Sequence, residues 1–305
     1  MRAVNPANWF GRGKKACARC LLGAVLASGS AALAEEIRVT DGSIFLKQPA
    51  QRIISLAPNV TELLFAAGAG ERVVGAVEYS NYPEAAQRIA RVDDSAQLDL
   101  ERIIALRPDL IVVWRNGNAQ RQLEKLLHLG IPVFYSDAHR LSDIPRGIEQ
   151  LGRLAGTQTV ALRAARTFME REAELRLRYA GRAPVTVFYQ IWDKPLMTVN
   201  TDHLISDVIR LCGGRNIFAD LKQLVPEIAT EEVLAADPDA IGGVAAEVGQ
   251  VGNLDGWKSW PRLKAVAHGN LFVIHSDLIS RDTPRILAGA REMCEQLDAA
   301  RARRK

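Results

Sequence analysis

The residue types that most often perform chemistry occur in this chain of 305 residues, but they do not form a recognised catalytic pattern. There is no Gly-x-Ser-x-Gly turn and no Gly-x-Gly-x-x-Gly loop, and the spacing within residues 252–259 does not fit a phosphate-binding loop. The histidines are scattered, whereas a zinc site needs clustered ligands; only a cleft could bring distant ones together (His128, His139, His203, His268 and His275). We therefore expect no enzyme, no resident metal and no cofactor.

The elements that would position a binding site are indicated by a stretch that the chain contains twice. Residues 98–114 and 229–241 align without gaps at an offset of 130 residues, which is much longer than the repeat of a solenoid. Each copy combines a short helix with an early glutamate, a Pro-Asp stop and an apolar run typical of a buried parallel strand. The matched pairs are Glu101 and Glu231, Ile104 and Leu234, Ala105 and Ala235, Pro108 and Pro238, and Asp109 and Asp239. The chain is therefore predicted to hold two similar lobes.

The first 34 residues have the pattern of an export signal. A basic region precedes the apolar residues 21–33, which are too few to span a bilayer, and Ala32 and Ala34 fit the small-residue cleavage rule. The mature chain would then begin at Glu35; the alternative is a disordered basic tail. Removal of the signal leaves 34 basic residues (39 less 5) against 35 acidic ones, so the net charge of +4 is no indication of nucleic-acid binding.

The export signal also changes how the four cysteines are interpreted. Cys17 and Cys20 would leave with the signal, so only Cys212 and Cys294 would remain, in a compartment that permits disulfides. A bridge would close a loop of 82 residues and stabilise the fold by about 4–5 kcal/mol in the chain-entropy model. The alternative is two buried free thiols.

The remaining residues alternate between strand and helix patterns, which predicts an α/β fold with parallel sheets. In the first lobe, residues 35–141, we predict a helix over residues 60–67, with Asn59 as its N-cap and Glu62 completing a capping box. The connecting segment, residues 142–182, contains a stretch over 157–179 without glycine or proline, which predicts either a rigid helix of roughly 30 Å or an ordinary surface helix. The second lobe spans residues 183–305. We expect two similar parallel-sheet lobes joined by a long rigid helix, with a ligand cleft between them.

Six segments carry a resemblance to a known family. After residue 34, nearly the whole chain resembles the cobalamin-binding members of the helical-backbone class of substrate-binding proteins of ABC importers. Residues 56–68 and 100–110 match segments that haem and iron–siderophore carriers share, while residues 79–83, residues 114–118 and the two late cysteines are more particular to the cobalamin branch. Residues 212–218 and 276–285 match as well. The resemblance implies a periplasmic monomer that binds a corrinoid, with Cys212 bonded to Cys294.

The resemblance also implies the residues that contact the ligand. They are Tyr79, Trp114 and the loop formed by Asp277, Leu278, Ile279, Ser280 and Arg281. A corrin is a broad apolar disc fringed with amides, so flat aromatic walls and hydrogen-bonding groups at the rim suit it. The chain departs from the family at Leu278 and Ile279, where the family has aromatic residues, and near Val225, where the family has a tryptophan; Trp192 is expected to compensate. The alternative for Tyr79 and Trp114 is packing at strand ends.

One glutamate per lobe has an implied partner. In the family, such glutamates meet arginines on the two copies of the membrane permease, and they match Glu101 and Glu231. The alternative is that each glutamate only favours its helix N-terminus.

Three functions are therefore considered. The favoured one is periplasmic capture of cobalamin or another corrinoid for an ABC importer, with no nucleic-acid partner. A carrier of haem or a ferric siderophore on the same fold is the second, and an exported enzyme or scaffold is the third.

Overall fold

The structure is a computed structural model that describes residues 44–93, 97–115, 120–128, 130–245 and 254–304, together with the backbone of Ile37–Arg38. All of them belong to one compact unit, Glu35–Lys305. The predicted export signal, with Cys17 and Cys20, lies outside the described residues, as do residues 116–118 of the matched segment 114–118.

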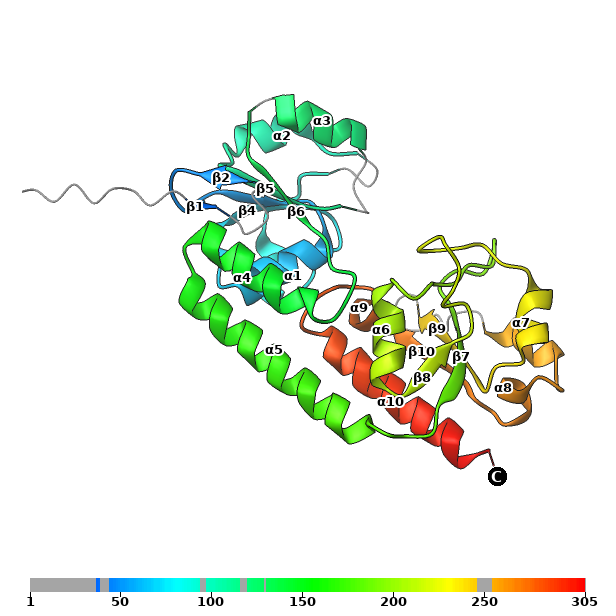
Figure 1. Cartoon of the computed structure of the whole chain (residues 1–305). Coiled ribbons are helices and arrows are strands. Elements are labelled where there is room, and N and C mark those ends of the chain that lie inside the picture. Colours follow the sequence, from blue (N-terminus) through cyan, green and yellow to red (C-terminus); the bar gives the residue numbers. More distant parts are fainter. Residues whose placement is uncertain are drawn as a thin grey trace, which may run out of the picture. The chain divides into compact units, whose positions relative to one another are not determined.

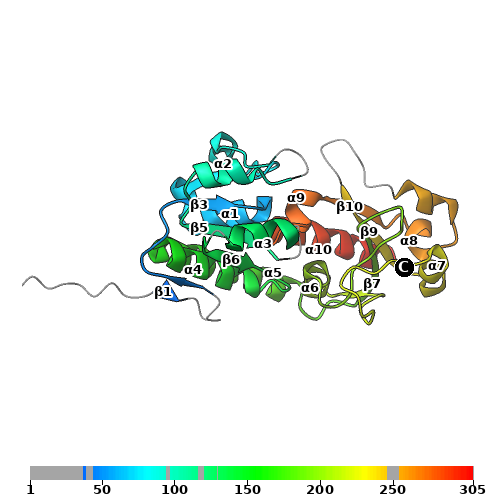
Figure 2. The same ribbon diagram turned by 90° about the horizontal axis from the view of Figure 1, so that it is seen from above.

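The first lobe is built on a four-stranded parallel sheet with the strand order β4-β3-β5-β6 (Figures 1 and 2). Its strands are β3 (Ile53–Ser55), β4 (Val73–Ala76), β5 (Leu110–Trp114) and β6 (Val133–Ser136). The helices between them are α1 (Pro58–Ala66), α2 (Leu100–Ala105) and α3 (Gln120–His128). Before the sheet, β1 (Ile37–Arg38) and β2 (Phe45–Leu46) form an antiparallel pair.

The second lobe repeats this arrangement. Its sheet is also parallel and has the order β8-β7-β9-β10. In both lobes, therefore, the second strand along the chain lies at one edge of the sheet, followed by the first, the third and the fourth. The strands are β7 (Val185–Gln190), β8 (Gly214–Asn216), β9 (Ala240–Ala245) and β10 (Leu271–His275). The helices are α6 (Leu204–Leu211), α7 (Thr230–Ala236), α8 (Lys264–Ala267), α9 (Ser276–Ile279) and α10 (Ile286–Ala302).

Both faces of each sheet are buried. Consecutive residues of a strand point to opposite faces, and the two faces pack in different hydrophobic cores. In the first lobe Ile53 packs in a core that continues into the second lobe, while Ile54 packs in a smaller core on the opposite face. In the second lobe Val187 belongs to the shared core and Phe188 to a third core around Trp257. Runs of apolar residues rather than an alternating pattern are what such two-sided burial requires.

Two helices connect the lobes. Helix α4 (Asp143–Ala155) ends at Gly156, whose φ of 66° is the left-handed conformation that glycine adopts without strain. Helix α5 (Gln158–Tyr179) then runs for 22 residues, roughly 33 Å at 1.5 Å per residue. It packs against α4, against α1 of the first lobe and against α6 and α10 of the second (Figures 1 and 2). The predicted long helix joining two similar lobes is therefore confirmed.

The repeated stretch has the same local geometry in both lobes. It forms α2 and β5 in the first lobe and α7 and β9 in the second. Arg107 and Asp237, the residues before the matched prolines, both have positive φ, at 47° and 43°. The carboxylate of Asp109 accepts hydrogen bonds from the backbone N–H groups of Gln51 and Arg52, before β3, and that of Asp239 accepts one from Thr186 in β7. The repeated aspartate thus binds the backbone at the start of the neighbouring strand.

The predicted capping of the first helix was wrong. Helix α1 begins at Pro58, and its N-cap, Ala57, makes no side-chain hydrogen bond. Proline fills the first helical position because it lacks an N–H that would need a partner. Asn59 and Glu62 therefore lie inside the helix, both are buried, and their side chains contact the second lobe.

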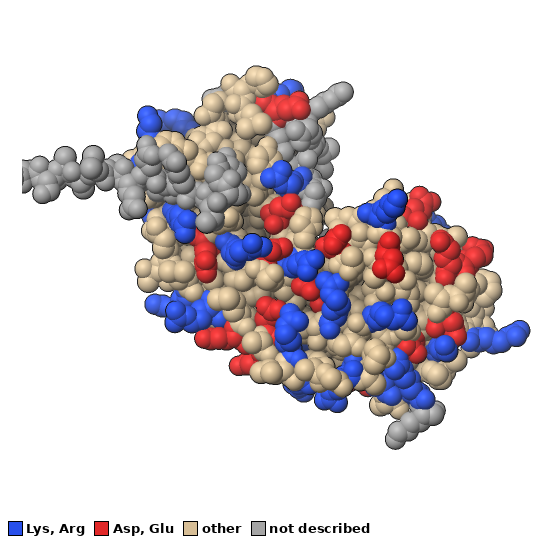
Figure 3. Space-filling model, in the orientation of Figure 1, with Lys and Arg blue, Asp and Glu red and all other residues tan. Residues whose placement is uncertain are grey.

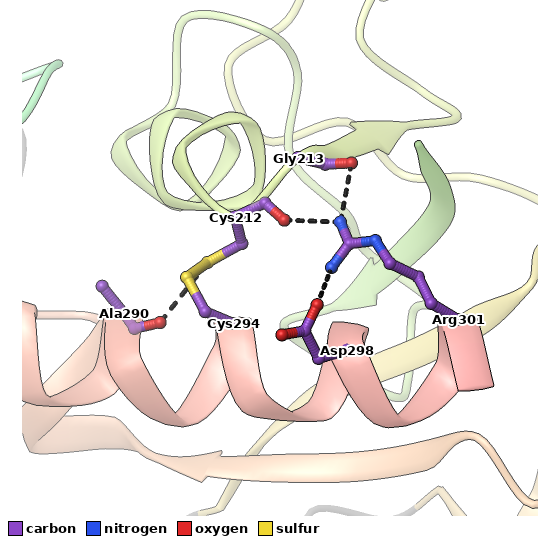
Figure 4. The surroundings of a disulfide bond; sticks show 6 residues. All are labelled: Cys212, Gly213, Ala290, Cys294, Asp298 and Arg301. Atoms are coloured by element: carbon purple, nitrogen blue, oxygen red, sulfur yellow. Dashed lines mark hydrogen bonds and ion pairs between the residues drawn. A yellow bond between two sulfur atoms is a disulfide. The ribbon is translucent and has the colours of Figure 1, made fainter. Parts of the chain in front are cut away.

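The predicted disulfide is confirmed (Figure 4). Cys212, at the end of α6, is bonded to Cys294 in α10. Arg301 of the same helix donates from Nη2 to the carbonyl oxygens of Cys212 (2.6 Å) and Gly213 (3.1 Å), so a second set of contacts secures the turn after α6.

On the face shown in Figure 3, acidic and basic side chains are interspersed. Within the described ranges, no helix has the length and apolar character needed to cross a bilayer.

Candidate functional site

The residues predicted to contact a ligand all lie near the carboxyl ends of parallel strands. Tyr79 follows β4 by three residues, Trp114 is the last residue of β5, Trp192 follows β7 by two residues, and residues 277–281 come directly after β10. In open parallel sheets, ligands bind beyond the carboxyl ends of the strands, where the connecting loops leave the sheet. The fold therefore places residues from both lobes at the edges where a binding site is expected.

The loop after β4 presents Tyr79 to the solvent. Its backbone has a φ of 60°, which is uncommon for a residue other than glycine, and its side chain is 69% exposed. The next residue, Ser80, is fully buried; its hydroxyl accepts from Thr61, and its carbonyl accepts from Arg91 at 3.1 Å. The loop is thus held by its backbone and by Ser80, which leaves the aromatic ring of Tyr79 free to meet a ligand.

A cluster of charges joins helix α1 to the segment after β10. Glu62 of α1 accepts hydrogen bonds from Arg281 at 2.7 Å and from Arg285, through Nη2 at 2.7 Å and Nε at 2.9 Å. Arg281 also contacts Asp277 at 2.8 Å and donates to the carbonyl oxygen of Tyr79 at 3.3 Å. The structure therefore brings Tyr79, Asp277 and Arg281 together, and it adds Glu62 and Arg285 to them.

The charges in this cluster are mostly withdrawn from water. The side chain of Glu62 is 2% exposed, and those of Arg281 and Arg285 are 13% and 23% exposed. Burial lowers the pKa of Arg285, but its hydrogen bonds and ion pair with Glu62 outweigh that effect and raise the pKa above its ordinary value. Arg281 and Arg285 each form ion pairs with both Glu62 and Asp277. The guanidinium of Arg285 also lies 4.1 Å from the ring centre of Tyr82, a cation–π contact.

A second polar contact lies beside the first. Asn59 of α1 donates to Asp282 at 2.5 Å, and both side chains are buried. Burial raises the pKa of Asp282 to about 6, assisted by the negative charges of Asp137 and Glu62, although the hydrogen bond from Asn59 works in the other direction. The second carboxylate oxygen of Asp282 and the hydroxyl of Thr283 have no hydrogen-bond partner among the described residues.

A polar cavity of about 430 Å³ adjoins this contact at the edge of the first-lobe sheet. It is lined by residues that follow β5 and β6, among them Arg115 and Asp137, and by Asp282. Asp137 contacts Arg115 at 3.4 Å and His139 at 3.1 Å. No group of three or more possible metal ligands occurs in the part of the chain that the structure describes. Aromatic surfaces, hydrogen-bonding groups and a fixed loop suit recognition of a ligand by shape.

The other residues predicted to contact the ligand differ in how far their side chains are exposed to solvent. Trp114 is half-buried and packs against the shared core, as Leu278 does, whereas Ser280 is exposed. Trp192 is 62% exposed, and its Nε1 donates to the carbonyl oxygen of Lys194 at 3.0 Å. Ile279 is 1% exposed and belongs to the shared core, so in this structure it supports the loop and does not face outward.

Glu101 and Glu231 occupy equivalent positions in the first turns of α2 and α7. Both side chains are exposed, and neither makes an ion pair with a described residue. The side chain that completes the turn at the start of α7 is the neighbouring Glu232, which accepts from the N–H of Ala229 at 2.7 Å. Glu231 is therefore not needed for that local contact.

Sequence reasoning missed four members of the contact between the lobes: Asn59, Glu62, Asp282 and Arg285. The signal that could have found Glu62 is its position between apolar residues of a helix, where a carboxylate is buried only if it has a partner. The partners lie more than 200 residues further along the chain, and no local pattern identifies them.

The chain is similar in sequence to known vitamin B12-binding proteins. The vitamin B12-binding protein of Vibrio cholerae is 38% identical over 253 residues, covering 83% of this chain and 91% of that protein. The vitamin B12-binding protein of Yersinia pestis is 39% identical over 251 residues, covering 82% of this chain and 87% of that protein.

Solved structures show the same fold. The crystal structure of the periplasmic vitamin B12-binding protein of Vibrio cholerae superposes with a TM-score of 0.75 at 37% identity, covering 83% of this chain and 98% of that one. A periplasmic haem-binding protein from Roseiflexus has a TM-score of 0.71 at 23% identity, covers 82% of this chain and 99% of that one, and shows the fold alone. The family model for periplasmic binding proteins matches residues 53–278, and the chain belongs to that family.

Proposed function

We propose that this chain is a substrate-binding protein that captures cobalamin or a related corrinoid and delivers it to an ABC importer. The observation that supports this most directly is the grouping of Tyr79, Asp277 and Arg281 by the contacts between the loops after β4 and β10, with Trp114 and Trp192 at other strand ends of the same sheets. The similarity to vitamin B12-binding proteins at 38–39% identity supports the corrinoid as the ligand.

The proposed function requires the protein to bind its ligand without changing it chemically. The exposed ring of Tyr79 offers a flat apolar surface to a corrin disc, and Trp192 offers a second one from the other lobe. Arg281 has a more specific role, because the contacts of its Nη atoms already go to Glu62, Asn81, Asp277 and Tyr79. In this proposal Arg281 fixes the loop of Tyr79 against the loop after β10, so that the two loops meet the ligand without prior rearrangement.

The proposal includes the cellular route. Residues 1–34 act as the export signal, the mature chain works in the periplasm as a monomer, and lobes 35–141 and 183–305 flank the ligand. Glu101 and Glu231, one exposed carboxylate per lobe, are the contacts for the two copies of the permease. No resident cofactor and no catalytic step are required.

Titration calorimetry with cobalamin, cobinamide, haemin and a ferric siderophore tests the proposal. We expect one cobalamin to bind per chain, and we expect Tyr79→Ala to weaken it about tenfold by removing an aromatic contact. Trp260→Ala is the matched control, because Trp260 is also an exposed aromatic residue but lies outside the predicted site. Tighter binding of haemin or of the siderophore than of both corrinoids would reject the corrinoid in favour of that ligand.

A further inference from the structure

A large cavity is lined by none of the residues predicted to contact the corrinoid, although Glu62 and Arg285 of the charge cluster between the lobes border it. It has a volume of about 1000 Å³, is open to solvent on one side, and lies between α1, residues 82–83, the second half of α5 and the start of α10. None of Tyr79, Trp114, Trp192 and residues 277–281 lines it. This volume is at the upper end of the range found for small-molecule pockets, so an organic ligand of moderate size would fit.

The rim of this cavity carries an excess of positive charge. Arg171, Arg178 and Arg291 line it, and none of the three makes an ion pair with any residue that the structure describes. Arg285 lines it too but is already held by Glu62. The other acidic group is Glu174, which lies between Arg171 and Arg178 on α5; no ion pair within 4 Å joins it to either arginine. Three guanidinium groups thus surround a space with one free carboxylate.

The wall between these charges is apolar. Phe65, Leu175 and Leu287 line the cavity, each from a different helix. A second cavity of about 310 Å³ shares Ala66, Arg171 and Leu287 with the first and follows α5 toward its N-terminus, where Phe168 and Val160 line it. The two cavities are therefore neighbours along one side of α5, and the smaller one is mostly apolar.

We propose that this pair of cavities, the α5 groove, binds an amphiphilic organic anion with a carboxylate or phosphate head and an apolar chain. Arg171, Arg178 and Arg291 bind the head, because guanidinium groups form charge-assisted, often bidentate hydrogen bonds with both kinds of anion. The chain extends along α5 over Phe65 and Leu287, into the smaller cavity. Neither inorganic phosphate alone nor a neutral amphiphile satisfies both halves of the groove.

Titration calorimetry on delipidated protein tests this assignment with four probes: dodecanoate, dodecyl phosphate, dodecyl maltoside and inorganic phosphate, each amphiphile below its critical micelle concentration. We expect at least one of the two anionic amphiphiles to bind at least about tenfold more tightly than both dodecyl maltoside and inorganic phosphate. The first two probes distinguish a carboxylate ligand from a phosphorylated one. Equal binding of the neutral and anionic amphiphiles, or no binding of either anion at millimolar concentration, would overturn the proposal.

Two variants locate the site. Arg171→Gln/Arg178→Gln/Arg291→Gln should weaken the anionic amphiphile at least about tenfold, since it removes the three guanidinium groups that have no ion pair with a described residue. Ala288→Trp should weaken it by filling the larger cavity from an exposed position. Arg176→Gln is the control, because Arg176 lies on the same helix but is paired with Glu172 at 2.6 Å and does not line the groove. Undiminished amphiphile binding in both test variants would reject the groove as the site. Cobalamin titration of the same variants should be unchanged, so the two proposals fail separately.

Discussion

At the scale of single residues, the most consequential side chain is Glu62. It is a carboxylate in the middle of an apolar helix, and it is buried with two arginines from the other lobe. Taking such a group out of water costs several kcal/mol, and only close partners with good geometry offset that cost. The three hydrogen bonds to Glu62 supply those partners, and they fix α1 against the segment after β10.

We predict that Glu62→Gln destabilises the protein by about 3 kcal/mol, because it leaves two largely buried arginines with Asp277 as their one remaining shared counter-charge. Urea unfolding followed by circular dichroism measures the loss. Glu172→Gln is the control: it breaks an ion pair with Arg176 on the surface of α5 and should cost no more than about 0.5 kcal/mol. Equal and small effects of the two substitutions would show that the cluster between the lobes contributes little to stability.

The buried carboxyl of Asp282 predicts a pH dependence of stability. Its pKa of about 6 in the folded chain is above the unfolded value of 3.8, so the folded state binds the proton more tightly. This contribution to stability is therefore present in full below about pH 4 and is lost as the pH rises through 6; the total is about 3 kcal/mol for two pKa units. Asp137 and Glu62, the acidic groups that face it, act in the same direction.

Asp282→Asn should remove this dependence, because the amide is neutral at every pH and its oxygen can still accept from Asn59. We expect the variant to be more stable than the natural chain at pH 7, and we expect that advantage to shrink as the pH falls toward 4. Chemical unfolding at half-unit intervals of pH measures both curves. Parallel curves would mean that Asp282 does not titrate in this range.

At the scale of elements, the repeated helix–strand unit could be predicted because its causes are local. Proline stops each helix, an aspartate follows it, and the apolar run that comes next is buried on both faces of a sheet. The structure adds the reason for the aspartate: Asp109 and Asp239 each accept hydrogen bonds from the backbone at the start of the neighbouring strand. The alternation of strands and helices and the long α5 follow from equally local patterns.

Elements that depend on distant partners could not be predicted. Strand β8 has only three residues, begins with Gly214 and exists through its pairing with β7, so no periodicity identifies it. Asn59 and Glu62 satisfy the sequence rule for a helix start, yet Pro58 already begins the helix and their side chains bind the second lobe. Tyr79, Trp192 and Arg281 could be named as candidate contacts from the sequence, but the contact of Arg281 with the Tyr79 loop required the fold.

The disulfide bond joins two helices, and the effect of its removal on stability can be measured directly. It closes a separation of 82 residues and joins α6 to α10. We predict that Cys212→Ala/Cys294→Ala lowers the free energy of unfolding by about 4 kcal/mol, since the unfolded chain regains the entropy of that loop. Urea unfolding of the natural chain with and without reductant provides a second measure, and the double variant should not respond to reductant. Coincident unfolding midpoints of the oxidised, reduced and double-variant proteins would contradict the prediction.

At the scale of the whole molecule, one core continues through both lobes. Residues of the first sheet, of α4, α5 and α10 and of the second sheet belong to a single buried cluster. Because α5 packs against helices of both lobes, a large rotation of one lobe would have to break apolar packing as well as the contacts of Glu62. We therefore predict that the radius of gyration measured by small-angle scattering stays constant, within error, when cobalamin binds. A clear decrease would indicate hinge closure of the kind seen in binding proteins with flexible connections.

The last prediction concerns how a two-lobed protein meets a two-fold partner. Glu101 and Glu231 lie at equivalent places in the two lobes, both are exposed, and neither pairs with a described residue of its own chain. If each only favours its helix N-terminus, reversal of its charge should cost about 0.3–1 kcal/mol of stability and leave transport intact. If the two glutamates dock on arginines of the permease, Glu101→Arg or Glu231→Arg places like charges in contact and should reduce cobalamin uptake by more than about tenfold. Affinity for cobalamin and melting temperature should then remain nearly unchanged.

Glu170→Arg, the same reversal at an exposed position on α5, controls for net charge. Normal uptake in both docking variants would exclude a role for these glutamates in docking, whereas a loss confined to them would assign one contact to each lobe.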